Sequence, residues 1–194
     1  MNNYSQIENK FFHKGYVIKK AERKNALNYV RDFIKKEIIQ APILKKQNLK
    51  NFSFNTLHHF VSIKDLNGIR MRLFNDINKD KKFRNNFFLI AKNTLFSIVG
   101  NELAMQNKIN LSIQFPNDAS SLLPLHSDTW DGDSPFESVL WLPLVNCFKS
   151  KSMFILNSSK YEKFRKIYKK KKIKSVSHLH NTLKKDLDFI KINY

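Results

Sequence analysis

The sequence predicts an α+β protein in which a helical N-terminal half is followed by a double-stranded β-helix, or jelly roll. Three observations support this fold class. Apolar residues recur at helical spacing up to about residue 100, the apolar period changes to two near residue 109, and several short apolar runs separated by turn-forming residues follow. We expect a single domain over residues 1–194, with residues 1–105 mainly helical and residues 106–194 forming the strands.

Three helices are expected in the first hundred residues. The stretch 21–40 places apolar side chains three and four positions apart, which puts them on one helix face. A second helix is expected over 65–77, with Asp65 as its N-cap. A third is expected over 79–99, with Gly100 as its C-terminal stop.

Short strands are expected after residue 105. In "INLSIQF", at 109–115, apolar and polar residues alternate strictly, the pattern of a strand with one buried face. Further strands are expected in "LPLHSD", "ESVLWLPLV" and "KSMFILN", and the last nine residues resemble the start of another. Residues 160–172 are expected to be helical or irregular.

The formal net charge of +19 raises the hypothesis of nucleic-acid binding, because a basic surface gains affinity for phosphates by releasing counterions. Composition argues against it. Lys far outnumbers Arg, of which there are six, and Arg is the residue that bidentate recognition of bases and phosphates prefers. The dense run "RKIYKKKKIK" at 165–174 is interpreted as a solvated helix end or loop.

The cellular compartment follows from cysteine use and hydropathy. The one cysteine, Cys147, cannot form an intramolecular disulfide, so a reducing cytosol is the default. The N-terminus lacks the features of a signal peptide, and no stretch approaches 18 consecutive apolar residues. We expect a cytoplasmic protein with no membrane association.

His126 and Asp128 form the main candidate site. Side chains two residues apart point to the same face of a strand, so this pair can reach one metal ion. An H-x-D pair and one distant His form the facial triad of non-haem Fe(II) enzymes. With six His and ten Asp in 194 residues, roughly 0.3 such pairs are expected by chance, so context must support the assignment. Asp131 and Asp133, on either side of Gly132, are interpreted as an ordinary turn.

The run from 100 to 156 supplies that context. It contains "NLSIQFP", "LPLHSDTW", "GDSPFE" and "KSMFIL", and it resembles the iron(II)/2-oxoglutarate-dependent oxygenases found sporadically in bacterial carbohydrate-biosynthesis clusters, within the phytanoyl-CoA-hydroxylase-like group. The similarity extends upstream through "DLNGIRMRLFNDIN" and covers most of the chain. It implies a jelly roll, Fe(II) bound by His126 and Asp128, 2-oxoglutarate and molecular oxygen as co-substrates, and a sugar-linked small-molecule substrate.

Further roles are implied by the same resemblance. Gln114 is a candidate for facing the co-substrate pocket, with a solvent-facing position as the alternative, and Lys151 is a candidate partner for the distal carboxylate of 2-oxoglutarate. The third iron ligand of the family follows the H-x-D pair on a later strand, which we expect beyond Tyr194; His178 and His180 are the weaker candidates. We therefore expect an incomplete or truncated chain without the closing strands and with impaired activity.

Two other functions remain open at this point. The chain is alternatively a non-catalytic jelly-roll binding module, in which the H-x-D pair holds no catalytic metal. It is also, with less support, a basic nucleic-acid-binding protein. The third metal ligand distinguishes the enzyme from the binding module. The sequence is silent on oligomeric state.

Overall fold

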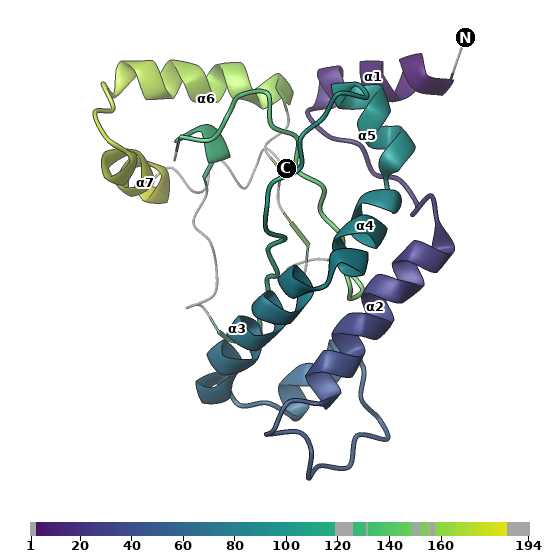
Figure 1. Cartoon of the computed structure of the whole chain (residues 1–194). Helices are drawn as coiled ribbons and strands as arrows, with labels where there is room; N and C mark the ends of the chain where they lie inside the picture. The colour runs from purple at the N-terminus through teal and green to yellow at the C-terminus, as the bar shows by residue number, and fades with distance from the viewer. Residues whose placement is uncertain are drawn as a thin grey trace. The chain divides into compact units, whose positions relative to one another are not determined.

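The computed structural model of the chain divides into two compact units, each described by itself (Figure 1). Unit 1 consists of residues 1–18, 123–139 and 148–194, and unit 2 of residues 19–122 and 140–147. The structure describes residues 3–118, 126–130, 132–148, 152–153, 155 and 158–185, and within α1, α6 and α7 it describes some residues by their backbone alone.

Unit 2 is built from α-helices and one 3-10 helix. Its elements are α2 (Lys24–Ile39), η1 (Phe54–His59), α3 (Ile63–Lys79), α4 (Lys81–Leu89) and α5 (Lys92–Val99). Helix α2 packs against both α3 and α4, which follow each other closely along the chain (Figure 1). These three helices form the frame of the unit.

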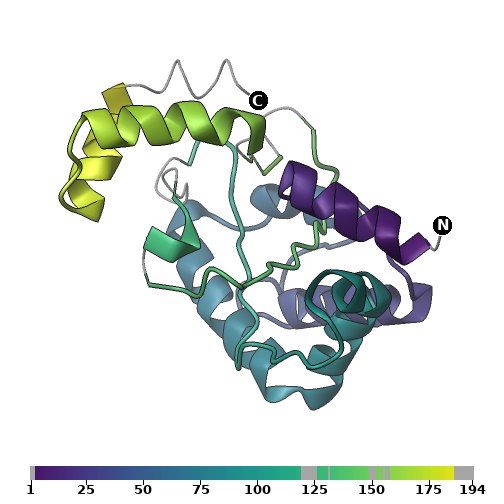
Figure 2. The same cartoon turned by 90° about the horizontal axis from the view of Figure 1, so that it is seen from above.

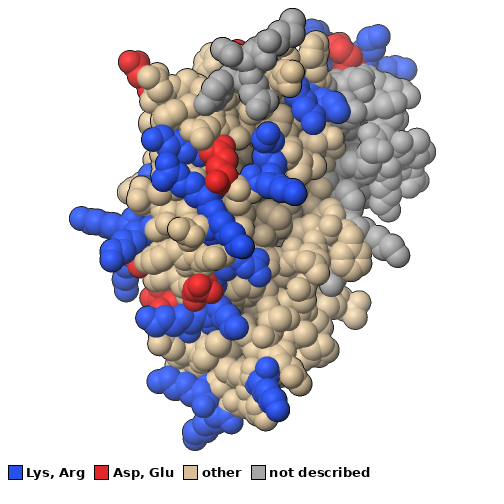
Figure 3. Space-filling model, turned by 90° about the vertical axis from the view of Figure 1, so that its right-hand side faces the viewer, with Lys and Arg blue, Asp and Glu red and all other residues tan. Residues whose placement is uncertain are grey.

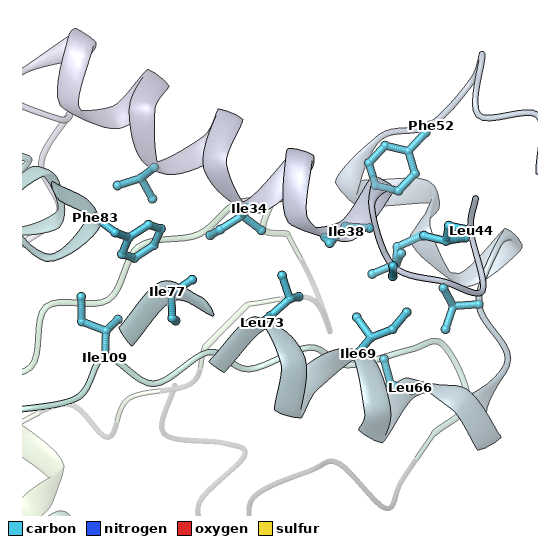
Figure 4. Close-up of a cluster of buried hydrophobic side chains, with 14 of the residues drawn as sticks. Ile34, Ile38, Leu44, Phe52, Leu66, Ile69, Leu73, Ile77, Phe83 and Ile109 are labelled. Atoms are coloured by element: carbon cyan, nitrogen blue, oxygen red, sulfur yellow. The ribbon is translucent and has the colours of Figure 1, made fainter. Parts of the chain in front are cut away.

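The apolar core of unit 2 lies between α2 and α3. Figure 4 shows Ile34 and Ile38 of α2 directed toward Leu73 and Ile69 of α3, and all four side chains are buried. Phe83 of α4 extends the cluster, and each fully buried side chain of this size contributes roughly 1.5–3 kcal/mol relative to an exposed one.

Two of the three expected helices are confirmed. Helix α2 buries Val30, Ile34 and Ile38 on the predicted face, and α3 buries the predicted apolar row on its inner side. The expected N-cap of α3 is wrong. Ser62 takes that position, and its Oγ accepts a hydrogen bond of 3.3 Å from the Asp65 N–H, so Asp65 lies inside the first turn.

The third expected helix, 79–99, is divided into α4 and α5. The break lies at Ile90 and Ala91, where the Ile90 carbonyl accepts a hydrogen bond of 2.8 Å from the Glu22 N–H. The Glu22 carboxylate accepts hydrogen bonds from the N–H groups of Asn93 and Thr94, at 2.8 and 2.7 Å, and so caps the start of α5. Gly100 ends α5 as expected, with a positive φ of 83° that favours glycine.

The expected jelly roll is wrong, because the described residues form helices and no β-strand. Burial does alternate over 109–115, as the sequence predicts: Ile109 and Phe115 are buried, while Ser112 and Gln114 are exposed. The backbone of this segment, however, hydrogen-bonds to helix side chains. Arg70 donates to the Ile113 carbonyl, and Asn78 bonds both backbone groups of Ile109. The alternation therefore reflects one face of an irregular segment packed on helices.

The stretch 137–145 behaves in the same way. Leu142 and Leu144 pack against the core, while Val139 and Trp141 are exposed. Arg31 of α2 donates a hydrogen bond of 3.1 Å to the Leu144 carbonyl. Half of the expected strand 123–128 lies outside the described residues, and its described part, 126–128, forms no strand. The expected strand 151–157 lies largely outside the described residues, and the last nine residues of the chain lie wholly outside them.

Unit 1 contains the candidate site. Its elements are α1 (Asn3–Lys14), the 3-10 helix η3 (Asp128–Trp130), α6 (Ser158–Lys170) and α7 (Val176–Lys185). Helix α1 packs against α6, and the chain turns sharply at 171–175 before α7 (Figure 2). Helix α6 confirms the helical alternative for 160–172, and in the described part of the chain no helix is long and apolar enough to cross a membrane.

Candidate functional site

His126 and Asp128 lie close together, as predicted. The Nε2 atom of His126 is 3.6 Å from the Oδ1 atom of Asp128, and the two side chains are 37% and 47% exposed. At this separation the contact is an ion pair, when His126 is protonated, and not a hydrogen bond. Both groups are therefore accessible to a ligand from solution.

A 3-10 turn, and not the predicted alternation of a β-strand, brings the two side chains together. Asp128 is the first residue of η3, and the Trp130 N–H donates a hydrogen bond of 2.8 Å to the Ser127 carbonyl. The Ser127 and Thr129 hydroxyl groups are 2.8 Å apart and share a hydrogen bond. The turn thus fixes the backbone on both sides of Asp128.

The chain after η3 turns again. The Asp133 N–H donates a hydrogen bond of 3.2 Å to the Asp128 carbonyl, and Gly132 has a φ of 102°, in the region that favours glycine. This confirms the interpretation of Gly132 and Asp133 as turn residues. Asp131 lies outside the described residues.

The donor chemistry of the pair fits two of the three protein ligands of an iron site. Imidazole nitrogen and carboxylate oxygen suit Fe(II). Two ligands with bonds of about 2.1 Å to one ion lie at most about 4.2 Å apart, so the observed 3.6 Å between Nε2 and Oδ1 is compatible with a shared ion. Among the described side chains, no group of three His, Cys, Asp or Glu completes such a site.

The other predicted site residues are not placed at this pair by any contact within unit 1 that the structure describes. Gln114 is exposed and belongs to unit 2, whereas His126 and Asp128 belong to unit 1. Lys151 and Tyr194 lie outside the described residues. His178 is exposed on α7, and the side chain of His180 is not described.

An aromatic contact that the sequence does not predict supports the site. Trp130 stacks on Phe164 of α6, with ring centroids 5.9 Å apart and an interplanar angle of 18°. The ring centroids of Tyr161 and Phe164 are 6.3 Å apart, so Phe164 contacts an aromatic ring from α6 as well as Trp130. The spacing of Tyr161 and Phe164 is the helical signal that the sequence contains, but nothing in it pairs them with Trp130.

The groups with shifted pKa values, Glu22, Tyr29 and Asp80, belong to unit 2. Burial acts to raise the pKa of Glu22, but hydrogen bonds from Thr94 and from the Asn93 N–H outweigh it and lower the pKa. Burial likewise acts to raise the pKa of Asp80, and hydrogen bonds from the Phe83 N–H and the Tyr29 hydroxyl lower it. Burial and the bond to Asp80 raise the pKa of Tyr29. These shifts mark structural contacts of the helices.

On the face drawn in Figure 3, Lys and Arg are dispersed among neutral residues, with few acidic groups between them. The densest run in the sequence, 165–174, falls on the end of α6 and the turn after it, and its described side chains are mostly exposed. The exposure of this run agrees with the interpretation of a solvated helix end.

One hollow of about 340 Å³ lies in unit 2, at the start of α2. It is lined by Arg23, Lys24, Asn25, Ala26, Asn86 and Leu89. None of the predicted site residues contributes to it. The candidate site therefore depends on the His126 and Asp128 pair.

Comparison with known proteins adds no assignment: no family model, no curated protein and no solved structure matches the chain.

Proposed function

We propose that this chain binds Fe(II) through His126 and Asp128 and acts, with impaired activity, as a 2-oxoglutarate-dependent hydroxylase on a carbohydrate-related small molecule. The observation that carries the proposal is the 3.6 Å separation of His126 Nε2 and Asp128 Oδ1 in an accessible turn. The resemblance of residues 100–156 to the oxygenase family supplies the reaction class.

The donor pair supports an iron site by its chemistry. A neutral imidazole and an ionised carboxylate together carry one negative charge, which leaves a bound Fe(II) ion with a net positive charge that favours the anionic co-substrate. Two ligands also leave coordination positions open, which substrate chemistry requires. A third protein ligand is a further part of the proposal, and His178 and His180 are its candidates within this chain.

The atoms of the two co-substrates and the substrate are all accounted for in the proposed reaction. Bound Fe(II) supplies the redox chemistry that converts 2-oxoglutarate, oxygen and a substrate C–H bond into succinate, carbon dioxide and a hydroxyl group. One oxygen atom enters succinate and the other enters the product. The residues of this chain bind and orient the reactants, as protein groups do around a cofactor that carries the hard chemistry.

Succinate formation tests the proposal. The purified chain is mixed with Fe(II), 2-oxoglutarate and oxygen, and a panel of monosaccharides, sugar phosphates and nucleotide sugars is added one compound at a time. We expect at least one compound to stimulate succinate formation in the wild type and not in the His126→Ala or Asp128→Ala variant. Because the proposed reaction requires bound Fe(II), EDTA is expected to abolish succinate formation.

The matched control is His59→Ala, since His59 is also an exposed histidine but lies on η1 in unit 2. This variant is expected to keep the full rate. Stimulated succinate formation that persists in both His126→Ala and Asp128→Ala would show that the pair does not bind the metal. No stimulation by any compound, with a folded wild type, would count against the hydroxylase.

A further inference from the structure

The 3-10 helix η3 is attached to α6 by an aromatic stack. Phe164 is only 7% exposed, although α6 is a strongly basic helix whose other described side chains are exposed. Its ring lies nearly parallel to that of Trp130, at an interplanar angle of 18°. The side chain of Phe164 is thus buried where it meets the turn that carries Asp128.

Trp130 links Phe164 to Asp128, because Trp130 and Asp128 belong to the same short 3-10 helix. The two residues are the last and the first residue of η3. The Trp130 N–H is hydrogen-bonded to the Ser127 carbonyl, so a fixed indole also fixes the turn that starts at Asp128. Stacking favours the packed arrangement of two rings by roughly two- to tenfold beyond their burial, which is enough to bias a short turn toward one conformation.

We propose that Phe164 is a positioning residue: through Trp130 it orders η3 and so holds Asp128 facing His126. The effect of Phe164 on metal binding rests on the proposed function, since it requires that Asp128 binds Fe(II). Its structural part stands on the stack itself. Helix α6 thereby acts as the support of the metal-binding turn.

Amide hydrogen exchange of Trp130 tests the structural part without metal. Labelling the chain with ¹⁵N-tryptophan gives two backbone amide signals, from Trp130 and Trp141, and Trp141 of unit 2 serves as the internal control. In Phe164→Ala we expect the protection of the Trp130 amide to fall by about two- to tenfold, with that of Trp141 unchanged.

The matched control is Leu179→Ala. Leu179 is 3% exposed on α7 and belongs to the same unit, so its truncation also destabilises unit 1 but leaves the stack in place. This variant is expected to keep the protection of the Trp130 amide. Phe164→Tyr retains the ring, and we expect it to restore the protection that Phe164→Ala loses.

Fe(II) titration tests the consequence. We expect Phe164→Ala to raise the dissociation constant for Fe(II) by about two- to tenfold. The dissociation constants of Phe164→Tyr and Leu179→Ala are expected to match that of the wild type. Equal Trp130 protection in the wild type and Phe164→Ala, or an equal loss in Leu179→Ala, would overturn the inference. A wild type that binds no Fe(II) would instead refute the proposed function, while the exchange data still decide whether Phe164 orders η3.

Discussion

Asn78 binds both backbone groups of Ile109 with one side-chain amide. Its Nδ2 donates a hydrogen bond of 3.0 Å to the Ile109 carbonyl, and its Oδ1 accepts one of 2.7 Å from the Ile109 N–H. A neighbouring β-strand would satisfy a residue in this manner. Here a helix side chain takes that role, which explains how residues 109–115 pack on α3 without a sheet.

Asn78→Ala is expected to destabilise unit 2 by about 2 kcal/mol, because it leaves both backbone groups of the buried Ile109 without this partner. Chemical denaturation of the two proteins measures the difference. Asn86→Ala is the control, since Asn86 donates to the Lys82 carbonyl at an exposed position of its own helix. If Asn78→Ala lowers the free energy of unfolding no more than Asn86→Ala does, the hydrogen bonds to Ile109 add nothing to stability.

The helices of unit 2 were predictable because their cause is local. Apolar residues three and four positions apart make a helix amphipathic whatever it packs against, and Val30, Ile34 and Leu73 are buried as expected. The division of the third helix was not predictable. It depends on Glu22, about seventy residues away in the sequence, and no local pattern indicates such a contact.

The expected strands failed for a related reason. A period of two predicts that alternate side chains are buried, and Ile109 and Phe115 confirm this, but it does not predict the hydrogen-bonding partner of the backbone. Asn78 and Arg70 supply that partner from α3. Part of the candidate site was predictable, since H-x-D spacing brings two side chains together in a turn as well as in a strand.

Glu22 is expected to make the stability of unit 2 fall as the pH is lowered. The pKa of its carboxyl group is lowered below 4.5 in the folded protein, so the ionised form stabilises the fold. This contribution is complete above the pKa of the unfolded chain and is lost as the pH falls through the lower pKa of the folded state. We expect Glu22→Gln to lower the free energy of unfolding by about 1 kcal/mol at pH 7, the size of a charge at a helix N-terminus.

Urea denaturation between pH 7 and pH 3 measures this effect. The difference between the wild type and Glu22→Gln is expected to shrink as the pH falls below 4.5, the ordinary pKa of this group. Glu102→Gln, at an exposed position of the same unit, is expected to match the wild type throughout. A difference for Glu22→Gln that stays constant down to pH 3 would contradict the role of the charge.

The positive charge of the chain is expected to give weak, nonspecific affinity for nucleic acid. Basic groups are dispersed on the face drawn in Figure 3, and Arg is scarce. Dissociation constants for unrelated oligonucleotides are expected to be no tighter than about 10⁻⁶ M at physiological salt, the ordinary nonspecific range. Fluorescence anisotropy with labelled DNA and RNA measures this. Binding in the nanomolar range would favour the nucleic-acid-binding protein over the hydroxylase.

The most direct test of the central claim is anaerobic titration of the folded chain with Fe(II) in the presence of 2-oxoglutarate, followed by the visible charge-transfer band of the ternary complex. We expect the wild type and the His59→Ala control to develop the band, and we expect His126→Ala and Asp128→Ala to lose it. A folded wild type that develops no band, or a band that survives both substitutions, would contradict an iron site at His126 and Asp128.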